Sequence, residues 1–296
     1  MNRRKENEIK GIFGLVVLVF LIFLLIPLAR LFLKSFMGDA GLTLGHYTEV
    51  LTGRGFLQAF GNSLLISSVS AVVTTVLAFI LAYAVHYCNL PRQYKGFINR
   101  AAVAPMLLPT ITYGFAIIYS FGKQGLITQM VGTQLFDIYG FNGLLLGYVI
   151  YTLPVSFLLL SNTMSYVDKK FSIVSRIMGD SPFATFVGTV LRPLLGTLAA
   201  SFVQCFFLCF TDYGIPASVG GEFEVVATVL YNEMLGSVPN FSRGACVAMM
   251  MLIPSVVTIA LLHYLEKYNI RYNKISQIEI RKGVVRDTAL GVLSAL

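Results

Sequence analysis

Residues 62–85 read NSLLISSVSAVVTTVLAFILAYAV, and none of these 24 residues is charged. At 1.5 Å per residue a helix of this length spans about 36 Å, more than the hydrocarbon core of a bilayer, which is about 30 Å thick. Five further apolar runs carry at most one charged residue each. The sequence therefore predicts an all-α membrane protein with six transmembrane helices, near residues 11–33, 62–85, 101–121, 142–162, 195–214 and 244–263.

The composition of the whole chain supports this class. Hydrophobic residues make up 56% of the 296 residues, charged residues only 12%, and the mean hydropathy is +0.75. A soluble domain carries about 25% charged residues, so a soluble protein is excluded. A transmembrane β-barrel is excluded too, because its strands alternate over about ten residues. Cys205, Cys209 and Cys246 lie in the apolar runs and are interpreted as small core residues.

The positions of the basic residues predict the orientation. With six spans, seventeen of the 22 Lys and Arg fall on the side of the N-terminus, and the other side keeps Lys34, Arg54, Lys123 and Arg243. Because basic residues accumulate on the cytoplasmic side, we expect both the N- and the C-terminus to be cytoplasmic. Residues 1–10 then form a basic cytoplasmic N-terminus. The net charge of +8 needs no nucleic acid as partner, since topology and anionic lipid explain it.

The predicted cytoplasmic loop 163–194 contains two short helical patterns with a turn between them. Ser165 or Asp168 can cap the first helix, and Gly179 can end it in the left-handed conformation. Ser181 can cap the second helix, because a proline follows it at the first helical position. The apolar stripe of the first helix is Phe171, Val174, Ile177 and Met178. The loop is thus predicted to be a compact knob with an apolar face and a basic collar, and the alternative is that the stripe lies flat on the bilayer or packs under the bundle.

This loop resembles the cytoplasmic signature of the permease subunits of binding-protein-dependent ABC importers, in which Glu-Ala-Ala precedes a glycine, a leucine and a proline. Gly179 matches the glycine and Leu191 the leucine. Ile173-Val174-Ser175 replaces Glu-Ala-Ala, and Pro193 lies one residue late, behind Arg192. Other segments resemble the same family, namely PMLLP (105–109), FGKQGLI (121–127), Gly140 to Gly147 and Thr152-Leu153-Pro154. The segments TDYGIPASVGG (211–221), VVATVLY (225–231) and Leu235-Gly236-Ser237 are similar to its iron(III) and 2-aminoethylphosphonate branch.

The resemblance implies a MetI-like permease bundle over residues 11–265, multi-pass in the inner (plasma) membrane. It implies ATP-binding cassette ATPase subunits, a second permease domain (fused or separate) and an extracytoplasmic substrate-binding protein as partners. The loop would be the coupling helix that docks on the ATPase. The coupling residues that it implies are Ser175, Gly179, Asp180, Ser181, Pro182 and Phe183. No catalysis and no cofactor are expected, because the chain has no Walker-type loop and no spaced ligand cluster.

Three polar residues of the spans are candidates for a transport pathway. Asp212, at the outer end of the fifth span, is the acidic residue closest to a predicted span and a candidate gate. Its alternative is an ordinary aspartate at a helix end near water. Asn62 and Ser67 of the second span either line the pathway or form hydrogen bonds between packed helices.

The sequence as a whole favours the permease of an ATP-driven importer, working by alternating access on 2-aminoethylphosphonate or iron(III). A polyamine- or sulfate-type ABC permease is an alternative. So is a secondary transporter driven by an ion gradient, although that class needs ionisable groups near the midplane. In the tail 266–296, Thr288–Leu296 is apolar again. We expect it to begin a second fused permease repeat, and the alternative is a short tail on the membrane surface.

Overall fold

The fold is helical throughout, apart from one two-stranded hairpin. The computed structural model describes residues 3–38, 41–53 and 55–266, so the predicted tail segment Thr288–Leu296 lies outside the described residues. The described chain forms two compact units, each considered separately. Unit 1 contains the described residues of 1–57 and 229–253, and unit 2 contains those of 58–228 and 254–266.

Unit 1 begins with the first long helix of the chain. Its elements are α1 (Arg3–Phe20), the π-turn η1 (Leu21–Leu25), α2 (Ile26–Phe36), β1 (Met37–Gly38), β2 (Gly41–Leu42), α3 (Gly45–Thr52), most of α13 (Val226–Leu235) and the first half of α14 (Phe241–Glu266). The two strands pair antiparallel, with Met37 opposite Leu42. The end of α2 is fixed by Ser35, which is fully buried and whose hydroxyl lies 2.8 Å from the hydroxyl of Tyr47 on α3.

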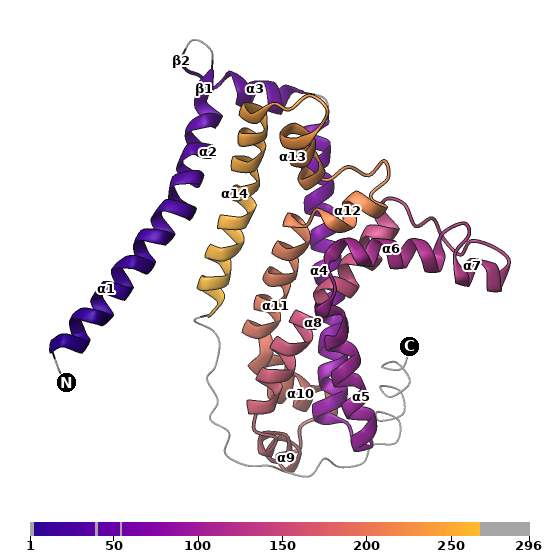
Figure 1. The fold of residues 1–296 in the computed structure, drawn as a ribbon. Helices are drawn as coiled ribbons and strands as arrows, with labels where there is room; N and C mark the ends of the chain where they lie inside the picture. The colour runs from indigo at the N-terminus through magenta and orange to yellow at the C-terminus, as the bar shows by residue number, and fades with distance from the viewer. Residues whose placement is uncertain (1–2, 39–40, 54, 267–296) are drawn as a thin grey trace. The chain divides into compact units, whose positions relative to one another are not determined.

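Unit 2 holds the central bundle. Its elements are α4 (Phe56–Tyr87), α5 (Arg92–Val103), η2 (Ala104–Leu107), α6 (Thr110–Phe121), α7 (Leu126–Val131), α8 (Phe141–Tyr166), α9 (Lys170–Ile177), α10 (Pro182–Phe186), η3 (Val187–Leu191), α11 (Arg192–Thr211) and α12 (Gly214–Val219). In this unit α4, α8 and α11 run side by side, α9 and α10 lie at one end, and α12 lies at the other (Figure 1).

Five of the six predicted spans are present as long apolar helices, and the remaining one has a different form. Within the described residues, five helices are long and apolar enough to cross a membrane: Lys10–Phe36, Phe56–Tyr87, Phe141–Tyr166, Pro182–Thr211 and Phe241–Tyr264. The sixth is a broken pair, Arg92–Leu107 and Thr110–Val131, bent by 110°. The predicted span 101–121 is therefore not one straight helix. Pro109 has no N–H and disfavours helical geometry at Leu108, whose backbone is extended (φ −103°, ψ 143°).

A second difference concerns the loop 163–194. The second of its two predicted helices is short in the sequence pattern, but α10, η3 and α11 form one continuous helix of 30 residues, Pro182–Thr211. The π-turn η3 precedes Pro193, which lies at the start of α11, where its missing N–H is tolerated in the widened turn. The knob is thus directly continuous with the fifth span.

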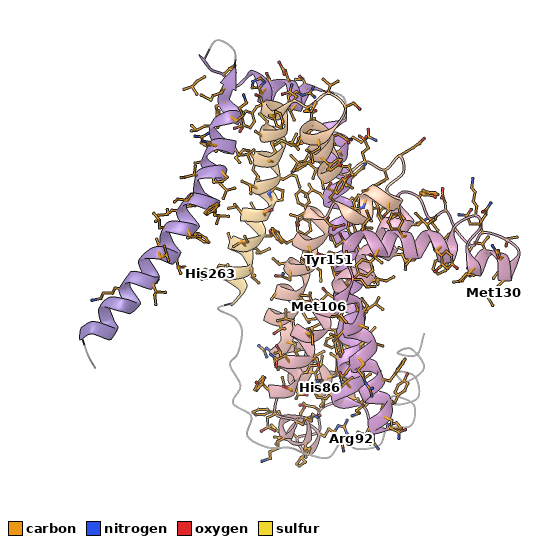
Figure 2. The ribbon with its side chains drawn as sticks, viewed as in Figure 1. His86, Arg92, Met106, Met130, Tyr151 and His263 are labelled. Atoms are coloured by element: carbon orange, nitrogen blue, oxygen red, sulfur yellow. The ribbon has the colours of Figure 1, made fainter. Side chains whose placement is uncertain are left out.

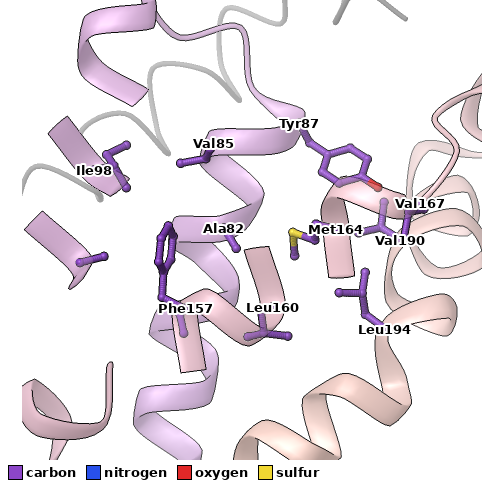
Figure 3. Close-up of a cluster of buried hydrophobic side chains, with 12 residues drawn as sticks. Ala82, Val85, Tyr87, Ile98, Phe157, Leu160, Met164, Val167, Val190 and Leu194 are labelled. Atoms are coloured by element: carbon purple, nitrogen blue, oxygen red, sulfur yellow. The ribbon is translucent and has the colours of Figure 1, made fainter. Parts of the chain in front are cut away.

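The apolar core of unit 2 lies at the end of the bundle that carries α9 and α10. There α4, α5, α8 and α11 meet around Phe157, Leu160 and Met164 of α8 (Figure 3). The other buried members of this cluster are Ala78, Ala82, Val85, Tyr87, Ile98, Ala102, Val167, Val190 and Leu194. Alanines on α4 and α5 allow close approach of the helices, which is how membrane helices gain packing energy without a hydrophobic driving force.

Glycines hold the opposite end of unit 2 together. A Cβ on Gly114 of α6 would overlap Ser218 of α12, and a Cβ on Gly214 would come within 2.7 Å of the backbone nitrogen of Ile111. On α8, a Cβ on Gly147 would come within 2.7 Å of Ile215. The short helix α12 is therefore wedged between α6 and α8, at positions where only glycine fits.

This packing makes Gly114→Val a test of the wedge. Overpacking at a close contact costs about 1–3 kcal/mol, so we expect a lower midpoint of thermal unfolding in detergent. The four cysteines Cys88, Cys205, Cys209 and Cys246 are free and buried, so a thiol-reactive dye reports the unfolding. Gly14→Val in α1 is the matched control, because a Cβ there meets nothing within 4 Å. Equal midpoints for the two variants would contradict the wedge.

Candidate functional site

The six residues predicted for coupling lie together in the segment that joins α8 to α11. The helix α9 ends in a Schellman turn, in which the N–H of Asp180 bonds the carbonyl of Ser175 (3.1 Å) and the N–H of Gly179 bonds that of Arg176 (3.1 Å). Gly179 has a φ of +89°, so the predicted left-handed glycine is confirmed. Such a turn gives the backbone a defined direction between the two helices.

Side chains close the turn from both sides. Ser181 caps α10, since its hydroxyl accepts the N–H of Ala184 at 3.2 Å. The hydroxyl of Ser175 donates to the carboxylate of Asp180 at 2.5 Å and lies 3.1 Å from the hydroxyl of Thr185. These contacts tie α9 to α10. At the start of α9 the N-cap position is held by Lys169 and not by Ser165 or Asp168, although the carboxylate of Asp168 accepts the N–H of Lys170 at 2.9 Å.

The outer face of this segment is apolar and exposed. Side-chain exposure is 80% at Ile177, 78% at Met178 and 75% at Phe183. The predicted stripe is thus exposed, and Phe183 extends it onto α10. We call this set the knob surface; its members are Phe171, Ile173, Val174, Ile177, Met178 and Phe183. Contiguous apolar surface of this kind is typical of an interaction site.

Two contacts that the sequence did not predict fix the segment to the end of α4. The Nζ of Lys169 donates to the carbonyl of His86 at 2.7 Å and lies 5.5 Å from the ring centroid of Tyr87. The ring Nε2 of His86 lies 2.8 Å from the hydroxyl of Ser161 on α8. Figure 2 labels His86 near this end of α4. A lysine at the last carbonyls of a helix is favoured by the helix dipole.

Aromatic contacts also connect α10 to the end of α4. Phe186 of α10 meets the rings of Tyr83 and Phe79 edge to face, at centroid distances of 5.7 and 6.2 Å. Tyr83 in turn stacks on Tyr87 at 5.1 Å. These ring contacts join α10 to the end of α4.

Hydroxyl pairs connect the spans in the middle of the bundle. Thr74 lies 3.0 Å from Thr152, and Ser201 lies 3.3 Å from Thr75 and 2.5 Å from Ser156 (oxygen to oxygen in each case). All five side chains are buried. These hydroxyls connect α4, α8 and α11 by hydrogen bonds between packed helices.

The three candidate pathway residues make separate contacts. Asn62 donates to the carbonyl of Glu224 at 2.9 Å, and the neighbouring Ser63 accepts the N–H of Val226 at 2.8 Å. Both therefore hold the start of α13 against α4. Ser67 is fully buried, and its hydroxyl has no hydrogen-bond partner within the described part of the chain.

Asp212 lies one residue beyond the end of α11, at the junction with α12. Its carboxylate accepts the N–H of Ile215 at 2.9 Å, and further hydrogen bonds come from Thr110 and from the N–H of Gly214. Burial raises the pKa of the Asp212 carboxyl above its ordinary value, while these hydrogen bonds oppose the rise. The carboxylate thus joins α11, α12 and α6 at one point.

Among the described residues there is no cluster of three or more His, Cys, Asp or Glu that could hold a metal ion. The site therefore consists of the exposed apolar knob surface, the contacts that connect it to the spans, and the glycine-packed end of unit 2 at α12.

Comparisons with known proteins agree with this arrangement. The family model described as "Binding-protein-dependent transport system inner membrane component" matches residues 74–270. A putative ferric transport system permease protein of Haemophilus influenzae is 26% identical over 267 residues, which are 88% of this chain and 42% of that protein. The ferric transport system permease protein of Actinobacillus pleuropneumoniae is 25% identical over 284 residues, 94% of this chain and 40% of that protein. The chain spans about two fifths of the length of these relatives.

A solved structure gives the same fold. The bacterial ABC transporter involved in the import of the acidic polysaccharide alginate matches with a TM-score of 0.75 at 12% sequence identity, over 89% of this chain and 96% of the matched chain. The match of the family model over about two thirds of the sequence, together with this fold, decides the assignment. The chain belongs to the family of binding-protein-dependent transport system inner membrane components and has the MetI-like permease fold.

Proposed function

We propose that the chain is the membrane permease of an ATP-driven importer, and that the knob surface docks on a cytoplasmic ATPase subunit. The observation that carries the proposal is the combination of exposure and stiffness in α9 and α10. Ile177, Met178 and Phe183 are each at least 75% exposed, on a turn that hydrogen bonds close from both sides. A loop that only lies on lipid does not need a turn closed by hydrogen bonds in this way.

The proposed mechanism follows from the connections of the knob. Closure of the ATPase on ATP displaces α10, and α10 moves α11 with it because Pro182–Thr211 is one helix. The contacts of Phe186 and Lys169 pass the same displacement to α4. The spans then tilt about the middle of the bundle, where hydroxyl pairs connect them. This tilting is alternating access in its simplest form.

At the α12 end of unit 2, we assign the gate of the transport pathway to Asp212 and the residues around it. A carboxylate that joins three helices responds to their relative tilt, because its hydrogen bonds to α12 and α6 cannot all persist when α11 moves. Asn62 would position the start of α13 beside it, and Ser67, whose buried hydroxyl lacks a described partner, is the candidate for contact with the solute.

For the solute we propose iron(III), because both of the permeases reported above are named as ferric transport proteins. The assignment of 2-aminoethylphosphonate as the solute rests on the sequence resemblance of residues 211–231 alone. The remaining partners are a second permease domain and an extracytoplasmic binding protein, both implied by membership of a binding-protein-dependent family. We further propose that both termini are cytoplasmic, as the distribution of basic residues predicts.

The orientation can be tested with single cysteines. Lys170→Cys should resist an impermeant maleimide in intact cells and react after permeabilisation, whereas Glu224→Cys should react in intact cells. Both positions are exposed and the native cysteines are buried, so the background labelling is low. Labelling of Lys170→Cys from outside would contradict the proposed topology.

The knob is tested by Gly179→Val. A β-branched residue at a φ of +89° costs about 1 kcal/mol or more in backbone strain, although a Cβ there meets nothing within 4 Å. We expect normal insertion, weak co-purification with the ATPase and loss of uptake. Gly179→Asn is the matched control, because asparagine tolerates the left-handed conformation and should retain most activity.

Phe183→Asp separates docking from backbone geometry. Its ring is 75% exposed, so the change should leave the thermal midpoint unaltered and still abolish co-purification and uptake. Lys170→Ala, beside the knob surface, should be mild. If Gly179→Val and Phe183→Asp both assemble with the ATPase and transport normally, the knob is a membrane-surface hairpin and the docking proposal is wrong.

The energy source distinguishes the importer from the secondary transporter. In cells kept at constant ATP, collapse of the proton gradient should leave uptake of radioactive iron(III) almost unchanged, because ATP hydrolysis provides the driving force. Depletion of ATP with the gradient maintained should abolish uptake. The reverse pattern would favour the ion-gradient carrier.

A further inference from the structure

Unit 1 contains a cavity that the transport mechanism does not use. Its volume is about 560 Å³, and it lies between α2 and the facing ends of α13 and α14. The apolar part of its lining includes Leu33, Met37 and Phe241, each more than half exposed. Arg30 and Lys34 of α2 complete the lining. The size is that of a pocket for a small organic ligand.

Contacts next to the cavity connect the helices that line it. The hydroxyl of Ser35 donates to the carbonyl of Phe32 at 2.7 Å, and the thiol of Cys246 on α14 donates to the carbonyl of Ser35 at 3.3 Å. On the other side, Arg243 of α14 forms an ion pair with Glu233 of α13 at 3.0 Å. The end of α2 is thus joined to α14 by a hydrogen bond, and α14 is joined to α13 by an ion pair.

The two cations of the lining point to the chemistry of the occupant. Arg30 and Lys34 are four residues apart and therefore lie on one face of α2. Neither forms an ion pair with any residue in the described part of the chain. Arg30 lies six residues before the end of the span Lys10–Phe36, about 9 Å along the helix axis, and a long basic side chain near the end of a span extends its charged head toward the lipid headgroups.

We propose that this cavity binds an anionic phospholipid, with its phosphate between Arg30 and Lys34 and an acyl chain along Leu33 and Phe241. A phospholipid satisfies both parts of the lining at once. A soluble anion would pair with the cations and leave the apolar wall uncovered. An apolar helix of a protein partner would cover the wall and leave two cations unpaired at the edge of the hydrocarbon, which is costly.

The test uses the absence of tryptophan from the chain. Phe241→Trp places a single fluorescent reporter in the cavity, and the full chain is reconstituted in vesicles that contain phosphatidylglycerol or phosphatidylcholine with brominated acyl chains, which quench tryptophan at short range. We expect brominated phosphatidylglycerol to quench at a much lower mole fraction. Each cation near the surface should contribute about fivefold to this preference.

Two controls make the result specific. In Phe20→Trp, the reporter lies on the exposed face of α1 far from both cations, and both lipids should quench it equally. In the Phe241→Trp background, Arg30→Gln with Lys34→Gln should remove the preference. Phe20→Trp in that same doubly neutral chain should still be quenched by both lipids, which demonstrates insertion of the variant.

Every other outcome overturns the proposal. Equal quenching of Phe241→Trp by the two lipids means that the cavity holds bulk lipid without selection. Quenching by neither lipid means that protein covers the cavity, for instance a second copy of the chain. A preference that survives the loss of both cations means that the phosphate is not bound between them. None of these outcomes bears on docking of the ATPase at the knob surface.

Discussion

The fold depends on the rule that a backbone polar group inside hydrocarbon must find its partner within the protein. The sharpest case is the break at Leu108 and Pro109, where the helical bonding pattern stops inside a predicted span. There the hydroxyl of Tyr113 donates to the carbonyl of Pro105 and lies 3.4 Å from that of Leu108. With these carbonyls satisfied, α6 can leave the direction of α5 and meet α12, which the glycine packing then holds.

The two ends of unit 2 are packed by different kinds of contact, and this difference is compatible with the proposed transmission of motion from the knob to the spans. At the α12 end, glycines bring backbones into direct contact, so the packing tolerates little change. At the α9–α10 end, the contacts are made by long side chains, such as Lys169 on the carbonyl of His86 and Phe186 on Tyr83. Long side chains can follow a moving helix while remaining in contact. In the proposed mechanism, the contacts at the α9–α10 end therefore persist while the helices move.

The sequence predicted what depends on local chemistry. The spans follow from uncharged length, the turn follows from Gly179 and Ser181, and the knob surface follows from helical spacing. It could not predict contacts between distant residues, such as Lys169 with His86 or Thr74 with Thr152, since nothing in the local pattern marks one hydroxyl as the partner of another. The continuity of α10 with α11 was missed for a different reason: Pro193 signals a helix end, and a π-turn absorbs it instead.

The departures of the loop from the family signature have a structural counterpart. Ser175 stands where the pattern has an alanine, and its hydroxyl bonds both Asp180 and Thr185 across the turn. A hydrogen bond to a charged group contributes about 1.5–3 kcal/mol, which is comparable to a good helix cap. The turn in this chain is therefore stabilised by its own side chains as well as by Gly179. A weak match to the signature is compatible with a well-defined knob, because the turn is stabilised by side-chain contacts that the signature does not specify.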